Sequence, residues 1–409
     1  MIGNAWLLVS ILLFLGAAVL RQAPLLLIAL LFLITGGVAR LWARFVFERV
    51  EYRRHLSAAR AFWGEEVTLE VGLTNRKLLP MPWLQITEEV PRDVTFITSK
   101  VYPSDQPTRA ILSQFLSLGA YHRRVRRYRF SCPRRGYFAF GPTRVRSGDL
   151  FGFFQKDMTF PDADHLLVYP KIVPLDNLGI PSKDPFGDLR VRRHLFQDPI
   201  RVVTTRDYAA GDPQRYIHWK ASARTGRLQS KVFEPTTTVD FGLFLDVRTL
   251  KYPLWGGVEQ RLEVGVLAAA SLAKFAVDNG FRVGLYANQF YQHSNHLIKL
   301  PPSSHPDQFL QVLEALAHVS PYEMVSMSQL VEQEARSLSW GATLVVISAA
   351  PTEALLASML RFRRAGRRVA LVHVGDETPL PSLDGLTVYH VSDDVYWREM
   401  ADVRLEPQV

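Results

Sequence analysis

The N-terminal part of the chain carries two apolar runs that lie close together. Residues 5–20 and 24–39 contain no charged side chain and are separated by only three residues. A helix that spans a bilayer needs about 20 apolar residues, and a few neighbours bring each run to that length. A signal peptide would start with basic residues, but the first four side chains are uncharged. We therefore expect a two-helix transmembrane hairpin over residues 1–44, with a buried hairpin of a soluble core as the alternative.

The distribution of arginine around these runs predicts the orientation of the chain. The turn between the runs offers only Arg21, whereas six arginines follow the second run: Arg40, Arg44, Arg49, Arg53, Arg54 and Arg60. Loops rich in Lys and Arg stay in the cytoplasm. A single cysteine, Cys132, excludes an internal disulfide and agrees with a reducing compartment. We expect an inner (cytoplasmic) membrane protein that crosses twice, with its soluble domains in the cytoplasm.

Between residues 56 and 165, apolar and polar residues alternate with a period of two. Such runs occupy residues 67–73, 83–90, 125–130 and 143–148, and Pro or Gly-Pro signals separate them. Short alternating strands at this spacing are typical of an antiparallel β-sandwich, which we predict over 56–165. Five prolines between 170 and 200 disfavour a long helix. Residues 166–238 are therefore predicted to be a connecting segment.

From residue 239 onward, buried strands alternate with amphipathic helices. Strands are expected at 239–247, 282–287, 342–348, 367–374 and 387–391, the last at a sheet edge. Helices are expected at 258–277, 306–318 and 352–364. Ser304 is the expected N-cap of the second helix, with Asp307 three residues later. A strand–helix–strand order implies a parallel sheet, so residues 239–400 are predicted to form an α/β doubly wound domain.

The chain is basic, with a formal net charge of +9, and residues 121–146 hold nine arginines and no acid. These arginines are interleaved with Val125, Tyr128, Phe130 and Tyr137. In a strand, such spacing puts charge on one face and apolar groups on the other. Three uses compete for this basic face: an anionic lipid surface, a dock for a partner, and nucleic acid. We do not expect nucleic acid to be the partner.

Residues 206–234, here called the signature segment, mix charges with aromatic side chains. The candidate cluster comprises Arg206, Asp207, Tyr208, Gly211, Asp212, Arg215, His218, Trp219, Lys220, Ser222, Arg224 and Glu234. Arg suits bidentate pairing with carboxylate or phosphate, and histidine titrates near neutral pH. One use is an internal network in which the three acids neutralise part of the Arg set. The others are a dock for an acidic partner or phosphate, and a catalytic centre that uses Asp207, His218 and Arg224.

Motifs of common enzyme classes are missing from the sequence. It has no Gly-Lys-Ser/Thr phosphate loop, no His-Glu-x-x-His helix, no Gly-x-Ser-x-Gly elbow and no cysteine pair. His293, His296 and His305 have a spacing that suits no standard metal site, so we expect surface histidines. We therefore expect no cofactor and favour a non-enzymatic role.

The signature segment reads Arg-Asp-Tyr-x-x-Gly-Asp-x-x-Arg-x-Ile-His-Trp-Lys-x-Ser-Ala-Arg, and residues 147–152 read Ser-Gly-Asp-x-Phe-Gly. Together they resemble the signature of a bacterial membrane-protein family known as domain of unknown function 58. The resemblance covers the chain from the hairpin to the α/β domain. It implies a MoxR-type AAA+ ATPase as partner and a transglutaminase-like membrane protein as a possible second one.

The resemblance thus predicts a membrane-anchored, non-enzymatic adaptor or scaffold for a MoxR-type AAA+ ATPase chaperone system that assists protein assembly or maturation. The alternative is a membrane-bound hydrolase that acts on an acidic or phosphate-bearing substrate through the signature segment.

The order of elements in residues 239–400 resembles a von Willebrand factor A domain. Such domains hold Mg²⁺ with an Asp-x-Ser-x-Ser loop, because hard cations need oxygen ligands. Here the loop starts at Asp246, and Arg248 and Leu250 replace both serines. We expect a degenerate metal loop in which Arg248 pairs with Asp246 and which packs against the signature segment. Ser348 and Asp376 are also predicted at strand ends, where α/β domains place their chemistry.

Overall fold

The chain divides into two compact units, Met1–Tyr169 and Pro170–Val409. The computed structural model describes residues 5–20, 22–175, 196–209, 212, 214–236, 240–250, 257–292, 294–375 and 386–393. The boundary between the units lies close to the predicted end of the β-rich region at residue 165.

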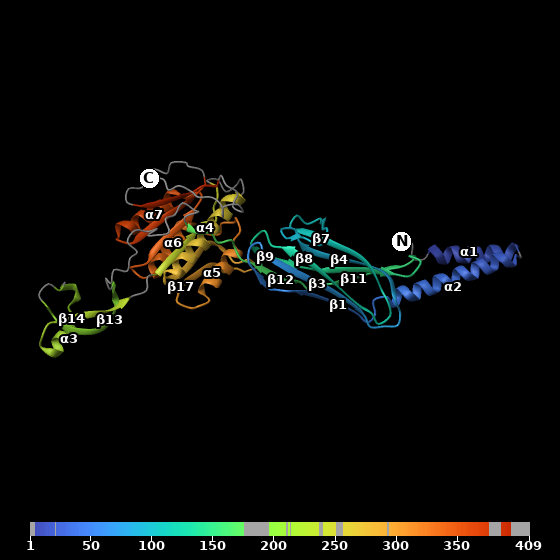
Figure 1. Ribbon diagram of the computed structural model, residues 1–409, viewed down its shortest axis with the longest axis horizontal. Helices are drawn as coiled ribbons and strands as arrows, with labels where there is room; N and C mark the ends of the chain where they lie inside the picture. The colour runs from blue at the N-terminus through green and yellow to red at the C-terminus, as the bar shows by residue number, and fades with distance from the viewer. Residues whose placement is uncertain are drawn as a thin grey trace. The chain divides into compact units, whose positions relative to one another are not determined.

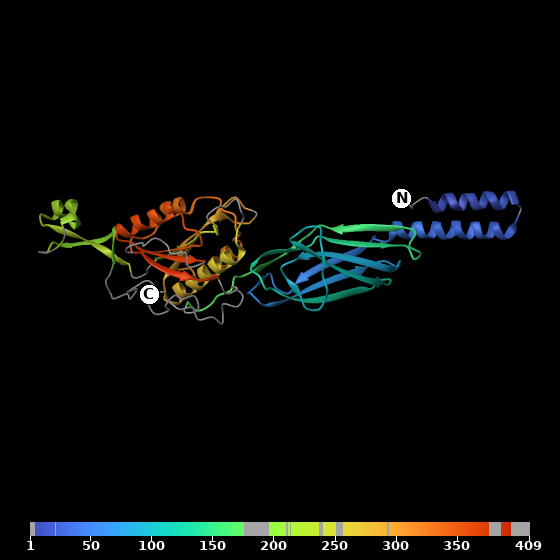
Figure 2. The same cartoon turned by 90° about the horizontal axis from the view of Figure 1, so that it is seen from above.

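The first unit begins with two apolar helices, α1 (Ala5–Leu20) and α2 (Ala23–Phe45), which lie side by side in Figures 1 and 2. Pro24 lies in the first turn of α2, where its missing N–H costs no hydrogen bond. In the described part of the chain, α2 is the helix long and apolar enough to cross a membrane, and the apolar part of α1, Leu8–Val19, is shorter. One membrane helix near the N-terminus is consistent with anchoring, and the second crossing stays a prediction.

Residues 50–168 form a large β-rich region. Its longer strands are β1 (Val50–Leu56), β3 (Glu66–Asn75), β4 (Met81–Pro91), β7 (Arg109–Leu118), β8 (Arg123–Ser131), β9 (Gly136–Phe140), β10 (Thr143–Gly148), β11 (Gln155–Phe160) and β12 (Asp164–Val168). The short strands are β2 (Arg60–Ala61), β5 (Thr95–Phe96) and β6 (Tyr102–Pro103). They form three sheets, ordered β1-β3-β8-β5, β11-β10-β4-β7-β6 and β2-β12-β9.

The period-two pattern locates β3, β4, β8 and β10 correctly, but β7 does not appear in it. Gln114 of β7 lies at a buried position, where it accepts a hydrogen bond from the Tyr128 hydroxyl at 2.7 Å. A polar residue on the inner face interrupts the apolar alternation, and its partner comes from another strand. The region also starts earlier than predicted, because β1 begins at Val50 and not at residue 56.

The two larger sheets share an apolar core. Leu69 of β3, Leu112 of β7 and Phe130 of β8 are at most 1% exposed and lie in one cluster. Burying a side chain of this size contributes about 1.5–3 kcal/mol. A second cluster joins Val46 and Phe47, which follow α2, to β-strand residues. The chain therefore passes from α2 directly into the core of the β-rich region.

Two lysines tie the end of α2 to this region. The Lys77 ammonium donates to the Val46 carbonyl at 2.7 Å, and Lys156 Nζ lies 3.5 Å from the Arg44 carbonyl. Cations are favourable at a helix C-terminus, where carbonyl groups lack helical partners. Burial lowers the pKa of Lys77 to about 8, against an opposing effect of Glu48. The position of α2 relative to the neighbouring strands is therefore held by polar contacts as well as by packing.

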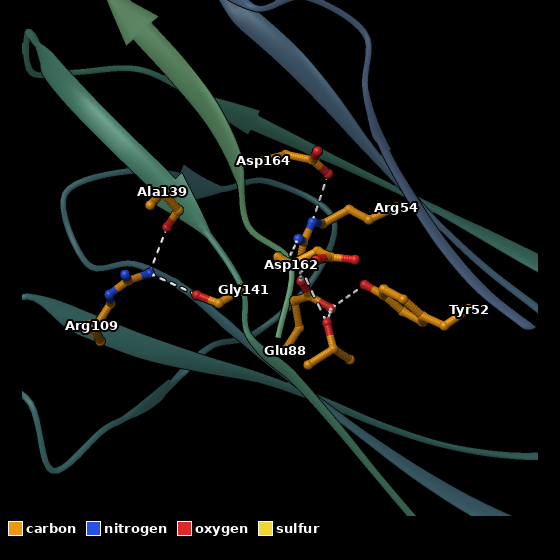
Figure 3. A network of polar contacts seen from close by, with 9 residues as sticks. Tyr52, Arg54, Glu88, Arg109, Ala139, Gly141, Asp162 and Asp164 are labelled. Atoms are coloured by element: carbon orange, nitrogen blue, oxygen red, sulfur yellow. Dashed lines mark hydrogen bonds and ion pairs between the residues drawn. The ribbon is translucent and has the colours of Figure 1, made fainter. Parts of the chain in front are cut away.

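Figure 3 shows a buried charge network between the sheets. Arg54 of β1 pairs with Glu88 of β4 at 2.5 Å and with Asp164 of β12 at 2.8 Å. Tyr52 and Thr143 donate their hydroxyl groups to Glu88 at 2.5 and 2.7 Å. Burial, with the neighbouring carboxylate of Glu88, raises the pKa of Tyr52. Arg54, one of the six arginines that follow the second apolar run, is thus a buried part of the architecture.

The arginines of β8 differ from the predicted pattern. Tyr128 and Phe130 are buried, but Val125 is 42% exposed and shares the face of Arg127 and Arg129. Arg127 pairs with Glu70 of β3 at 2.5 Å. The predicted division into an apolar and a basic face is therefore wrong at Val125, and acids of the neighbouring strand offset part of the positive charge.

The second unit contains a six-stranded sheet in the order β17-β16-β15-β18-β19-β20. The strands are β15 (Asp240–Leu245), β16 (Arg282–Phe290), β17 (Leu297–Ser303), β18 (Thr343–Ser348), β19 (Arg368–Val374) and β20 (Thr387–Val391). The helices are α4 (Glu259–Asp278), α5 (Gln308–Ala317), α6 (Met327–Ser337) and α7 (Glu353–Arg364). All neighbouring strands are parallel except β17, which runs antiparallel to β16.

Helices cover both faces of this sheet. Gly265 of α4 faces Leu245 and Ile347, whereas α6 and α7 pack in one cluster with Phe244 and Val346. Because successive side chains of a strand point to opposite faces, the two sets of helices lie on opposite sides.

The predicted strands and helices of this region are all present, with three differences. The pattern missed β17, whose Pro301 and Pro302 are tolerated because it is an edge strand. It also missed α6. Asp307, and not Ser304, is the N-cap residue of α5, and its side chain makes no capping hydrogen bond.

Candidate functional site

The signature segment folds as two antiparallel strands with a short helix between them. The strands are β13 (Phe196–Asp207) and β14 (Gln229–Thr236), and the helix is α3 (Trp219–Thr225). Gly226 ends α3 in the left-handed region, with φ of 68°, and its N–H donates to the Ser222 carbonyl. This conformation favours glycine, so a residue with a side chain would be strained there. The segment predicted as a connection thus has its own local structure.

His218 is the N-cap of α3. Its Nδ1 accepts a hydrogen bond from the Ala221 N–H at 3.1 Å, which satisfies a backbone donor that has no helical partner. The hydroxyl of Ser222 donates to the His218 carbonyl at 3.1 Å and accepts from the Gln229 N–H at 2.9 Å. His218 and Ser222 therefore join the helix to the start of β14.

Asp207, the last residue of β13, and the nearby Asp212 also accept hydrogen bonds within the segment. Asp212 accepts from the Ala209 N–H at 3.1 Å, from the Ser230 hydroxyl at 2.9 Å and from Arg206 at 2.6 Å. The backbone hydrogen bond from Ala209, followed by those from Ser230 and Arg206, lowers the pKa of Asp212. Asp207 accepts from the side-chain amide of Gln229. Both acids thus have internal partners.

The outer surface of α3 carries charges of one sign. Trp219 is 68% exposed, and the cations Lys220, Arg224 and Arg227, which are close to it in sequence, are exposed as well. Lys220 and Arg224 are four residues apart and therefore lie on the same side of the helix. Within the described ranges, none of the three cations pairs with an acid. We call these four residues the cationic-aromatic face.

The predicted cluster is brought together in part. Contacts join Arg206, Tyr208 and Asp212, and separately His218 and Ser222. No hydrogen bond or ion pair described here joins Asp207, His218 and Arg224 to one another. Gly211, His293 and Asp376 lie outside the described residues, as do the side chains of Arg215 and Glu234.

Sequence reasoning missed Gln229 and Ser230 as partners in this cluster. They bond Asp207 and Asp212, because the register of the strand pair sets Asp207 opposite Gln229 and Arg206 opposite Ser230. Predicting the strand pair would have revealed both residues.

A second cluster lies at the carboxyl end of the six-stranded sheet. The Ser348 hydroxyl donates to Asp246 at 2.8 Å, so the two predicted strand-end residues do meet. Asn288, which the sequence did not single out, donates its amide to Asp246 at 2.9 Å, and the Arg248 N–H donates at 3.1 Å. Burial raises the pKa of Asp246 to about 6, and nearby Glu323 adds to this effect while the hydrogen bonds oppose it.

The donor set around Asp246 does not suit a divalent cation. Its two oxygens accept three hydrogen bonds, and the residue is 5% exposed. The Arg248 Nε donates to the Leu250 carbonyl at 3.1 Å, within the turn itself. The described hydrogen-bond partners of Asp246 belong to the α/β region, and the packing of this loop against the signature segment stays a prediction. The cluster organises the strand ends.

A model of the family "Protein of unknown function DUF58" matches residues 204–396. The uncharacterized protein YeaD of Bacillus subtilis is 26% identical over 186 residues, which is 42% of this chain. The match spans 44% of that relative, less than half of its length. The second unit is therefore similar to a family whose function is unknown.

Solved structures resemble about a third of the chain. The CARDB domain of a Pyrococcus furiosus protein, in complex with di-metal ions, covers 30% of this chain and 90% of its own, with 10% identity and a TM-score of 0.20. A non-cellulosomal cohesin from Archaeoglobus fulgidus covers 29% of this chain and 91% of its own, with 10% identity and a TM-score of 0.21. With TM-scores this low, the likenesses support no statement about fold or activity.

Proposed function

We propose that this protein is a membrane-anchored, non-enzymatic adaptor that binds an acidic surface of a partner protein through the cationic-aromatic face. The observation that carries this proposal is the exposure of Trp219, Lys220 and Arg224 together on one short helix whose other contacts are internal. Trp and Arg are enriched among the residues that contribute most to protein interfaces. Exposed cations with no acidic partner in the described residues favour a binding partner with negative charge.

The side chains around the face support binding more than catalysis. A general base needs a free lone pair within reach of the substrate. The Nδ1 lone pair of His218 already accepts a hydrogen bond from the Ala221 N–H, and the side-chain amide of Gln229 fixes Asp207 in place. These contacts make the local structure rigid, and a rigid face loses little entropy when it binds.

The family resemblance suggests the partner. A MoxR-type AAA+ ATPase would bind the cationic-aromatic face and hydrolyse ATP, so that the adaptor couples it to protein assembly or maturation at the membrane. A transglutaminase-like membrane protein is a possible second component of the same assembly.

We infer the remaining architecture on the same basis. The β-rich region is an antiparallel β-sandwich, and residues 239–400 form a von Willebrand factor A-like domain. Helices α1 and α2 form a two-pass hairpin in the inner membrane, with both domains in the cytoplasm. The AAA+ partner is a cytoplasmic ATPase, which agrees with this orientation.

The test is co-purification of the full chain from native membranes with its partners. Lys220→Glu should abolish recovery of an AAA+ ATPase, because it places an acid against an acidic surface. Lys100→Glu is the matched control, since Lys100 is also exposed but lies in the first unit. Trp219→Ala should weaken the recovery as well, without changing the charge.

Loss of the ATPase with Lys220→Glu and Trp219→Ala, but not with Lys100→Glu, would support the proposal. Equal recovery from all variants would refute the role of this face. Absence of an AAA+ ATPase from the wild-type sample would refute the identity of the partner.

A further inference from the structure

Four connections meet at one end of the β-rich region. The register pairs Val50 with Asn75, Met81 with Leu118, and Gly148 with Gln155. The end of α2 therefore lies at the same end as the β3–β4, β7–β8 and β10–β11 turns. Contacts of Lys77 and Lys156 with the last carbonyls near α2 agree with this placement.

The tips of these turns carry exposed apolar side chains. Leu78, Tyr121, Leu150 and Phe151 are between 56% and 75% exposed, and Phe153 is 40% exposed. Each of the three turns contributes at least one of them. Four exposed arginines lie in or next to the same connections: Arg44, Arg49, Arg123 and Arg124. Apolar tips backed by cations are the pattern of a surface that enters the boundary of an anionic bilayer.

The β10–β11 turn is held in shape by Asp149, the acid of the Ser-Gly-Asp-x-Phe-Gly run. Its buried carboxylate accepts from the N–H groups of Phe151, Phe153 and Phe154 at 2.9, 3.3 and 2.6 Å. A Cβ at Gly148 would lie 2.1 Å from the Phe154 carbonyl oxygen, so only glycine fits there. With three of its backbone N–H groups bonded to this carboxylate, the turn leaves Leu150 and Phe151 exposed.

This turn reaches the apolar part of α2. The rings of Phe153 and Phe32 lie with their centroids 6.3 Å apart. Phe32 precedes Arg40, the first charged residue after the apolar run, by eight residues, or about 12 Å along the helix axis. A side chain in contact with Phe32 therefore lies at the depth of the apolar part of α2.

We propose that the Leu150–Phe153 turn inserts into the membrane beside α2, and that Leu78 and Tyr121 rest in the boundary of an anionic bilayer next to it. The inference rests on the membrane anchoring in the proposed function. The bilayer is the occupant because the turn contacts α2, which in the described part of the chain is the helix long and apolar enough to span it. Two attachments, the helices and the turn, hold the β-rich region in one orientation on the membrane.

The test uses nitroxide labels on the full chain in vesicles of phosphatidylethanolamine and phosphatidylglycerol. The only cysteine, Cys132, is buried, and burial raises the pKa of its thiol to about 12, so an introduced cysteine reacts selectively. Phe151→Cys reports on the turn and Ile34→Cys on α2. Phe62→Cys is the matched control, because Phe62 is 51% exposed and precedes β3, whose first residue Glu66 lies at the opposite end of the sheet.

Accessibility of each label to oxygen and to a water-soluble nickel complex gives its depth. The proposal predicts that Phe151→Cys behaves like Ile34→Cys, enriched in oxygen, while Phe62→Cys behaves as an aqueous site. An aqueous signal at Phe151→Cys with an apolar one at Ile34→Cys would overturn the insertion and leave the anchor intact. Aqueous signals at both would overturn the anchor and the insertion together.

Adding Asp149→Ala to the Phe151→Cys chain should raise the mobility of the label and reduce its oxygen accessibility. Unchanged values would overturn the role of Asp149 in presenting the turn. In a second chain that combines Asp149→Ala with Ile34→Cys, a label that stays at apolar depth shows that the variant is still inserted in the membrane.

Discussion

In the β-rich region, the side chains of Arg54 and Glu88 are at most 3% exposed and bond each other, whereas Lys220 and Arg224 of the signature segment face solvent. Both clusters combine charged groups with an aromatic ring. The buried cluster has its partners from several strands, so its charges stabilise one arrangement of the sheets. The exposed cluster satisfies its acids and its histidine internally and leaves its cations outward. Burial, and not residue type, separates the structural charge network from the exposed cationic-aromatic face.

The largest effect is expected where a buried charge loses its partner. Glu88→Ala leaves Arg54 without its closest carboxylate and should lower the free energy of unfolding by about 3–5 kcal/mol. Glu70→Ala is the control, since it removes an exposed ion pair with Arg127 that should contribute less than about 1 kcal/mol. Chemical denaturation of the full chain in detergent measures both. Similar losses from the two variants would contradict the comparison.

A change of intermediate size is expected in the pH dependence of folding stability. Because the pKa of Asp246 is about 6 in the folded chain and 3.8 for the ordinary group, the folded state binds more protons between these values. Stability from this group is therefore fully present below pH 3.8 and is lost as the pH rises through about 6. Asp246→Asn should reduce this dependence and raise the unfolding temperature at pH 7.

The control for Asp246→Asn is Asp278→Asn, which removes an exposed carboxylate from the same unit. The control should retain the pH dependence of the wild type in thermal unfolding. An unchanged pH profile in Asp246→Asn would refute the assignment of this titration to the buried cluster.

The smallest effect concerns the base of the cationic-aromatic face. His218→Ala removes the cap of α3 and should cost about 1 kcal/mol, seen as faster hydrogen exchange in residues 219–225. Lys220→Ala, an exposed change on the same helix, should alter exchange by less than about 0.5 kcal/mol. If both variants exchange alike, His218 is not the residue that holds the face in place.

The sequence predicted elements wherever local periodicity carried the information. The apolar run of α2 and the alternation in β3 and β4 are visible without any partner. The edge strand β17 was missed because Pro301 and Pro302 weaken its local signal, although its pairing with β16 tolerates them. In the same way, β7 was missed because Gln114 finds its partner only in the folded sheet.

The sequence predicted which residues belong to the candidate site, but not which contacts those residues make. The signature segment was found from its residues, and Asp246 and Ser348 from their places at strand ends. Gln229, Ser230 and Asn288 became visible only through strand register, because they act on residues distant in sequence.

By itself, the sequence determined the apolar helix near the N-terminus, most strands and helices of the α/β region, and the charge-rich segment, because these depend on patterns within a few turns of chain. The tertiary structure alone decided that Arg54 is buried while Lys220 is exposed, and that Phe153 reaches Phe32. Such outcomes depend on which distant residues come together, since burial and pairing set the free energy of a charge or an apolar ring.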